Sequence, residues 1–315
     1  WQPAATVAGA AAIGAGPLTA PQIVFVAGGQ TRPLANQPIP GRFAGHAFVR
    51  PTKVSFAAPD GLTIPGQLFA RSDGAAKKPA VIYVHGGPPR QMLLGPSYMR
   101  YYANAYAMNQ YLAARGFVVL SVNYRLGIGY GWDFQHPAKG GPAGASEYQD
   151  VLAAAKWLQG RPDVDPARIG IWGGSYGGLL TAQALARNSD VFKAGVDIHG
   201  VHDWSRVLIE EVGINPTSFG DEDRRIALET AYKASPVADI AGWRSPVLFI
   251  HGDDDRNVRV NQTIDLVKKL QGRGVAMEQL IVPNEIHDFL RHENWLKVDA
   301  ATAEFLERQL RLATP

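Results

Sequence analysis

The 315-residue sequence contains no cysteine, which excludes disulfides, thiol catalysis and thiolate-bound zinc. No apolar run approaches the roughly 20 residues that a membrane-spanning helix needs. Charge of neither sign dominates, because the sequence contains 31 Lys and Arg and 28 Asp and Glu, which gives a net charge of +3. No basic cluster indicates a nucleic-acid or lipid surface, so we expect neither nucleic acid nor a membrane as a partner. The missing cysteines leave the compartment unknown, because a bacterial cytoplasm and a periplasm are both compatible.

The beginning of the chain has an unusual composition. Residues 1–20 are rich in Ala and Gly, have no basic leader and are interrupted by Pro and Gly, so they predict neither a signal peptide nor an anchor. Trp1 stands where a methionine would start a natural chain, and we interpret this as a chain that begins earlier or is processed.

A serine motif dominates the middle of the chain. Residues 168–172 predict a short buried strand, residues 173–178 read Gly-Gly-Ser-Tyr-Gly-Gly, and residues 179–187 predict a helix. A strand, a Gly-x-Ser-x-Gly turn and a helix form a nucleophile elbow, in which Gly173 and Gly177 leave room for the backbone and the serine hydroxyl is exposed. We therefore predict that Ser175 is the nucleophile of a serine hydrolase.

A serine hydroxyl needs a base and an acid that orients this base. The predicted strand 246–250 ends in Asp253, Asp254 and Asp255, and the predicted strand 278–282 is followed by His287. Serine, acid and histidine follow one another in this order in α/β-hydrolases. Position selects His287, which follows the acid on a strand-exit loop, but spacing does not choose among the three aspartates.

Three other histidines also follow apolar strands and therefore lie at the same edge of the predicted sheet. These are His199, His202 and His251. None of them comes after the acid, so we expect structural or substrate-lining roles for them.

The remaining pattern predicts one α/β domain with a mostly parallel sheet of about eight strands, flanked by helices. Residues 52–57 and 63–70 predict a hairpin around Asp60 and Gly61, and residues 163–166 predict a turn. The segment 202–242, which Trp204 opens, lies where hydrolases insert lid helices. The other predicted strands are 80–84, 117–123 and 194–198, and the other predicted helices are 102–115, 146–159 and 295–312.

Three motifs together resemble the catalytic domain of the prolyl oligopeptidase family, particularly its acylaminoacyl and dipeptidyl peptidase branches. They are residues 173–178, the His-Gly-Gly-Pro of residues 85–88, and the His-Gly of residues 251–252 followed by Asp255, Asn257 and Val258. The resemblance covers residues 49–315 and implies an α/β-hydrolase fold. It also implies that Asp255 is the acid, because the family places it two residues before the Asn-Val pair. Asp253 and Asp254 are then loop charges or caps.

The oxyanion formed during attack needs hydrogen-bond donors. The backbone N–H of Tyr176 is the first, and a second is expected from the loop after residues 80–84. The family has a tyrosine hydroxyl at the position of His85. In this sequence the candidates for the second donor are therefore the Gly87 amide, the Gly86 amide and the His85 ring. The alternative is that the two glycines only form a tight turn and donate nothing.

The resemblance also implies a specificity pocket. Its walls map to Tyr176, Val201, Trp204 and Val258, which favour an apolar or proline-sized residue before the scissile bond. Asn257 matches a residue that binds a substrate carbonyl in the family. For Val201 and Trp204, plain core packing is an alternative.

Members of the family carry a β-propeller before the hydrolase domain. We interpret residues 1–48 as an N-terminal extension and as a candidate remnant of such a propeller. A predicted strand at 22–26 and a turn at Gly28 and Gly29 make residues 21–43 resemble the tail of a last blade. The chain is then a catalytic fragment, or its propeller is a separate segment, and the hydrolase domain is residues 49–315.

The predicted activity is that of a serine peptidase acting on short peptides. A carboxylesterase of the same fold is the alternative, since the three residues do not distinguish amides from esters, and a non-catalytic binding module is a third. Neither a metal nor a cofactor is predicted. The substrate is a peptide or a small ester, and exo- versus endopeptidase action and homo-oligomerisation stay open.

Overall fold

The computed structural model of the chain describes residues 4–34, 48–72, 76–210 and 221–311. Its centre is an eight-stranded sheet of order β12-β11-β10-β9-β7-β8-β6-β5. All neighbours are parallel except for β5 with β6 and β6 with β8. The strands are β5 (Thr52–Ala57), β6 (Thr63–Phe69), β7 (Lys78–Val84), β8 (Val118–Val122), β9 (Val164–Gly174), β10 (Phe192–Ile198), β11 (Val247–Gly252) and β12 (Met277–Val282).

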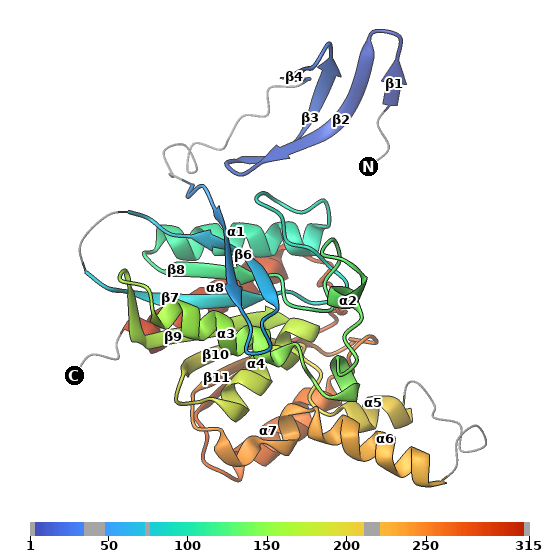
Figure 1. Cartoon of the computed structure of the whole chain (residues 1–315), viewed down its shortest axis with the longest axis vertical. Helices are drawn as coiled ribbons and strands as arrows, with labels where there is room; N and C mark the ends of the chain where they lie inside the picture. Colours follow the sequence, from blue (N-terminus) through green and yellow to red (C-terminus); the bar gives the residue numbers. More distant parts are fainter. Residues whose placement is uncertain (1–3, 35–47, 73–75, 211–220, 312–315) are drawn as a thin grey trace.

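Helices cover both faces of this sheet (Figure 1). Alternate residues of one strand enter different cores, as Ile82 and Tyr83 of β7 do. The core around Ile82 also contains side chains from α3, α4 and α7, and the core around Tyr83 contains side chains from α1 and α8. The helices are α1 (Arg100–Ala114), α2 (Trp132–Gln135), α3 (Tyr148–Gln159), α4 (Tyr176–Arg187), α5 (Trp204–Glu210), α6 (Asp221–Lys233), α7 (Asn261–Gln271) and α8 (His292–Arg311), with short 3-10 turns at Gly141–Ala143, Pro236–Ala238 and Ile240–Gly242.

A second, antiparallel sheet precedes the main one and lies apart from it in Figure 1. Its strands, in spatial order, are β1 (Ala4–Thr6), β2 (Gly9–Gly16), β3 (Thr19–Ala27) and β4 (Gln30–Pro33). The Tyr106 hydroxyl of α1 donates to the carbonyl of Pro17 at 2.7 Å and ties this sheet to the main domain. The predicted strand 22–26 and the turn after it are confirmed as part of β3 and the β3–β4 connection. Trp1 and residues 35–43 of the predicted blade tail lie outside the described residues.

The eight predicted strands and the α/β-hydrolase fold are confirmed. The turn predicted at 163–166 is wrong beyond Asp163, because β9 already begins at Val164, which pairs with Lys78 of β7. The expected lid segment contains α5 and α6, and residues 211–220 between them lie outside the described residues, as does Leu312 at the end of the last predicted helix. Among the described residues, none of the helices has the length and apolar character that a bilayer crossing demands.

Candidate active site

Ser175 occupies the sharp turn between β9 and α4. Its φ is +59° and its ψ is −119°, which is rare for a residue with a side chain. The turn is this tight because its glycines touch the neighbouring strand: a Cβ on Gly173 or Gly177 would overlap the carbonyl oxygen of Val84. The N–H of Ser175 donates to the carbonyl of Ile198 at 2.9 Å, which joins the turn to the end of β10.

Asp255 lies buried in the loop that follows β11. Its Oδ1 accepts the backbone N–H groups of Asn257 at 2.8 Å and Val258 at 2.9 Å, and its Oδ2 accepts the Nδ1–H of His287 at 2.6 Å. His251 Nε2 lies 3.4 Å from Oδ2. Burial acts to raise the pKa of Asp255, but the hydrogen bonds from His251 and His287 and the charge of His287 outweigh it and hold this pKa well below its usual range. Asp255 is therefore an ionised, fully hydrogen-bonded carboxylate.

The two aspartates next to it have other surroundings. Asp253 and Asp254 are exposed. Asp253 accepts the N–H of Asn284 at 2.6 Å, and Asp254 pairs with Arg256. Neither is bonded to His287 in this structure.

His287 lies in the loop between β12 and α8. The buried carboxylate of Glu285 shapes this loop by accepting the N–H of Leu290 at 2.6 Å, the N–H of Arg291 at 3.0 Å and the side chain of Asn294 at 2.6 Å. Because Nδ1 of His287 donates to Asp255, its Nε2 is left as a proton acceptor in the neutral ring.

Ser175 and His287 are connected through the end of β10. Ser175 bonds to Ile198, and the next residue, His199, stacks on His287 with ring centroids 4.1 Å apart. Among the residues that the structure describes, no hydrogen bond joins Ser175 Oγ to His287 Nε2. Such contacts are often long in enzymes without substrate and tighten when substrate binds.

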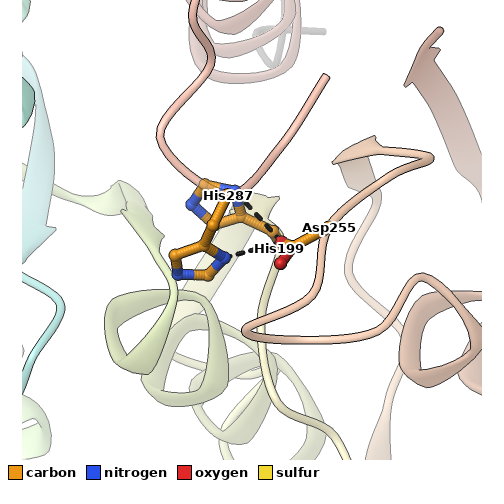
Figure 2. Close-up of side chains that lie close together, drawn as sticks. All are labelled: His199, Asp255 and His287. Carbon is orange, nitrogen blue, oxygen red and sulfur yellow. Dashed lines mark hydrogen bonds and ion pairs between the residues drawn. The ribbon is translucent and has the colours of Figure 1, made fainter. Parts of the chain in front are cut away.

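His199, Asp255 and His287 lie close together (Figure 2), and the ring nitrogens and carboxylate oxygens that they could offer to a metal ion lie within 4.8 Å of one another. A metal ion would need in-plane nitrogen lone pairs from both rings. Nδ1 of His287 already donates its proton to Asp255 Oδ2 at 2.6 Å, so this nitrogen has no lone pair to offer to an ion. The arrangement fits a hydrogen-bonded acid and base rather than a metal site.

The loop that follows β7 lies against Ser175. A Cβ on Gly86 would come within 3.1 Å of Ser175 Cβ, and Gly87 is exposed with φ +117°. Tyr176 is the first residue of α4, so its N–H has no partner within the helix. Gly86 and Tyr176 therefore lie next to Ser175, on the β7 loop and at the start of α4.

His85 is placed differently from these amides. Its ring is fully buried, stacks on Tyr124 at 4.3 Å, and has Nδ1 2.9 Å from the Gly86 carbonyl oxygen. Burial lowers the pKa of His85 to about 4. The ring is therefore neutral, with Nδ1–H used on Gly86 and Nε2 left without a proton to donate.

The predicted pocket residues lie in one region. Tyr176 and Trp204 have ring centroids 5.9 Å apart, and both pack with the buried Val201 and Val258 in the same core. Asn257 is exposed on the acid loop. Core packing and pocket lining are thus compatible for Val201 and Trp204.

Some residues around the site were not identified from the sequence. The buried Glu147 accepts the Tyr176 hydroxyl at 2.6 Å and the N–H of Gly141 at 3.1 Å, and burial raises its pKa. Tyr101 of α1 bonds to His199 at 2.8 Å. No local motif marks Glu147 or Tyr101, because both reach the site from helices or loops far away in the sequence.

The comparisons with known proteins agree with this geometry. The model of a family described as "Prolyl oligopeptidase family" matches residues 104–313. The chain belongs to the prolyl oligopeptidase family. This confirms the resemblance expected from the motifs.

Two similar proteins are named as a dipeptidyl aminopeptidase and as an acylamino-acid-releasing enzyme. Dipeptidyl aminopeptidase BIII of Pseudoxanthomonas mexicana is 32% identical over 259 residues, which are 79% of this chain and 36% of the relative. The acylamino-acid-releasing enzyme of Arabidopsis thaliana is 28% identical over 236 residues, which are 70% of this chain and 29% of the relative. The chain thus spans about a third of the length of these relatives.

Solved structures show the same fold. The acylaminoacyl peptidase of Pyrococcus horikoshii superposes with a TM-score of 0.79 at 25% sequence identity, over 97% of this chain and 49% of that one. A puromycin-hydrolyzing peptidase of Mycobacterium tuberculosis superposes with a TM-score of 0.79 at 24% identity, over 98% of this chain and 48% of that one.

Proposed function

We propose that this domain is a serine peptidase that cleaves peptide bonds of short peptides through an acyl-enzyme. The observation that carries the proposal is the 2.6 Å hydrogen bond between the buried Asp255 and His287 at the edge of the sheet where the elbow presents Ser175. The names of the relatives, a dipeptidyl aminopeptidase and an acylamino-acid-releasing enzyme, support an amide as substrate.

The residues have complementary roles in this reaction. Ser175 Oγ attacks the carbonyl carbon while its proton moves to His287 Nε2, and Asp255 stabilises the resulting imidazolium. The C–N bond then breaks, and His287 gives the proton to the leaving amine. Water attacks the acyl-enzyme in the second half, with His287 again accepting a proton and returning it to Ser175.

The oxyanion is bound by backbone donors. We assign the N–H of Tyr176 as the first and the N–H of Gly87 as the second, and each such donor contributes on the order of 3 kcal/mol in comparable enzymes. Gly87 is preferred to the His85 ring, because that ring is buried and has no free N–H to offer.

The residue before the scissile bond enters the space beside Tyr176. In this proposal its walls are Tyr176, Val201, Trp204 and Val258, and Asn257 on the acid loop donates to a substrate carbonyl. The apolar character of these walls favours an apolar or proline-sized residue there.

Two experiments test the activity. Reaction with a fluorophosphonate probe, with Ser175→Ala as the control, reports whether the serine is activated; absence of labelling in folded protein would reject the proposal. Turnover of aminoacyl and dipeptidyl anilides is then compared with turnover of short acyl esters. Activity on esters alone would replace the peptidase by a carboxylesterase of the same fold.

We also propose that residues 1–48 are what remains of a preceding β-propeller and that residues 49–315 are the catalytic domain. One support is the antiparallel sheet β1–β4, which has four strands, as one propeller blade has. The other is that this chain covers only 36% of the length of the dipeptidyl aminopeptidase. Intact mass of the native protein tests this, and a mass equal to this chain alone would contradict it.

A further inference from the structure

His199 lies at the end of β10, directly beneath the ring of His287. The two imidazoles are stacked, with centroids 4.1 Å apart and 24° between their planes (Figure 2). His199 is fully buried, and its N–H donates to the carbonyl of Ile250 at 2.7 Å. Its φ of +43° is uncommon for a residue with a side chain, so the end of β10 holds it in a costly conformation.

Tyr101 fixes the orientation of the His199 ring. The Tyr101 hydroxyl lies 2.8 Å from His199 Nε2, while His199 Nδ1 lies 4.0 Å from the carboxylate oxygen of Asp255 that also binds His287. A proton on Nδ1 is favoured beside this carboxylate, so the Tyr101 hydroxyl donates to Nε2. Gly174 makes the contact sterically feasible, because a Cβ there would overlap the Tyr101 hydroxyl and come within 3.0 Å of His199 Nε2.

His199 itself is unsuited to act as a base. The groups that face it are Tyr101, His251, Asp255 and His287. Burial, with the charges of His287 and His251, lowers the pKa of His199 well below its ordinary value. The ring is thus a neutral, rigid surface next to His287.

A second contact for His287 has a physical reason. Its hydrogen bond to Asp255 fixes the distance between the two side chains, yet leaves the ring free to tilt about the Nδ1···Oδ2 line, and histidine has a broad χ2 preference. A parallel ring against one face removes this freedom. The tilt decides whether Nε2 points at Ser175.

We propose that His199 is a positioning residue, which fixes the tilt of the His287 ring by stacking and is itself held by Tyr101. This inference rests on the proposed function, since it concerns the base of that reaction. It assigns a role to a residue that is not one of the proposed acid, base and nucleophile.

The test compares three variants of the full chain: His199→Ala removes the stack, His199→Leu fills the space without a flat face, and His199→Phe restores a flat ring. The measurements are kcat and KM for an anilide, the rate of fluorophosphonate labelling, and the far-downfield proton NMR resonance of the proton between His287 and Asp255. Labelling driven to completion gives the fraction of folded, competent protein in each variant, which corrects for any loss of stability.

We expect kcat and the labelling rate to fall roughly 10- to 100-fold in the Ala and Leu variants with KM nearly unchanged, the size of loss that a misplaced catalytic group produces. Their downfield resonance should broaden through faster exchange with water. The Phe variant should recover most of the rate and a sharp resonance.

Wild-type labelling rates in the Ala and Leu variants would overturn the inference, as would equal losses in the Leu and Phe variants. Both outcomes leave the proposed function intact. If the wild-type protein itself is not labelled, the proposed function fails first, so the two failures are distinguishable.

Discussion

Ser175 stands on a turn whose shape is set by backbone contacts, whereas His287 stands on a loop whose shape is set by side chains. The turn depends on glycines that touch the carbonyl of Val84, and it is bonded to β10 through a peptide group. The His287 loop depends on the carboxylates of Glu285 and Asp255 and on the ring of His199. The nucleophile should therefore be sensitive to added volume, and the base to lost polar or flat groups.

Different substitutions should therefore disturb the two halves of the site. A methyl group added to the turn meets backbone atoms, which cannot rotate away. A side chain replaced beneath His287 leaves the backbone path intact and changes only the direction of the ring. The following predictions probe the two halves, beginning with the largest effect.

Replacing Asp255 by Asn should lower kcat about 10⁴-fold. The amide cannot stabilise the imidazolium, and its NH₂ group favours the wrong tautomer of His287. Steady-state kinetics on an anilide measure this. Asp254→Asn is the matched control, because Asp254 is exposed one residue away, and it should keep nearly full activity. Similar losses in both variants would contradict the assignment of the acid.

Replacing Gly177 by Ala should destabilise the fold on the order of 3 kcal/mol and abolish labelling of Ser175 in the protein that remains folded. The added methyl group overlaps Val84 and cannot be moved aside without opening β7 and α4. Urea unfolding measures the change. Gly160→Ala is the control: its Cβ would make only ordinary contacts and its φ is −78°, so stability should be unchanged or slightly higher. Equal stability of the two variants would contradict the claim that the turn is tight because Gly177 contacts the backbone of Val84.

Replacing Gly174 by Ala should slow labelling roughly 30-fold, because the methyl group would displace the Tyr101 hydroxyl and with it the His199 ring. This position joins the two halves of the site. Tyr101→Phe removes the hydroxyl and should by itself cost about 3-fold, the worth of one modest hydrogen bond. In the double variant the two losses should not add, and most of the Gly174→Ala loss should be recovered. If the losses in labelling rate add in the double variant, the methyl group of Gly174→Ala does not act by displacing the Tyr101 hydroxyl.

Asp299 of α8 should make a smaller, pH-dependent contribution on the side of the base. Burial raises its pKa to about 6, against a hydrogen bond from Asn104 of α1 that lowers it. Its folded pKa lies above the unfolded value of about 3.9, so the folded state binds the proton more tightly and stability is gained as pH falls from about 7 to about 4. The full difference between the two pKa values corresponds to about 3 kcal/mol. Because Asp299 is only partly buried, Asp299→Asn should be more stable than the wild type by about half of that at pH 8. The difference should vanish below about pH 4, as thermal unfolding at several pH values would show, and a constant difference would contradict the raised pKa.

The main sheet could be predicted because its strands are continuous apolar runs, as residues 80–84 and 246–250 illustrate. The start of β9 could not, since Val164 joins the strand only by pairing with Lys78, which lies far away in the sequence. The N-terminal sheet was recognised at β3 alone. Strand β2 is a run of Ala and Gly with a single Ile, and such a run lacks the β-branched or alternating pattern that marks a strand.

The site shows the same division. Ser175 and His287 are marked by local sequence, a motif and a strand exit, and Asp255 was singled out among three aspartates by resemblance to the family. Local spacing could not choose it, because its neighbours Asp253 and Asp254 differ from it only in burial and in hydrogen bonds. Tyr101 and Glu147 carried no signal at all, since their roles come from packing across the sheet.

The pairing of β11 with β12 has a consequence for a newly made chain. During synthesis the serine emerges first, the acid second and the imidazole last, each on a different strand exit. In the proposed mechanism, the hydroxyl of Ser175 has no proton acceptor until the last parallel strand has docked. In this mechanism, the reactivity of Ser175 therefore depends on the strand of the sheet that is made last.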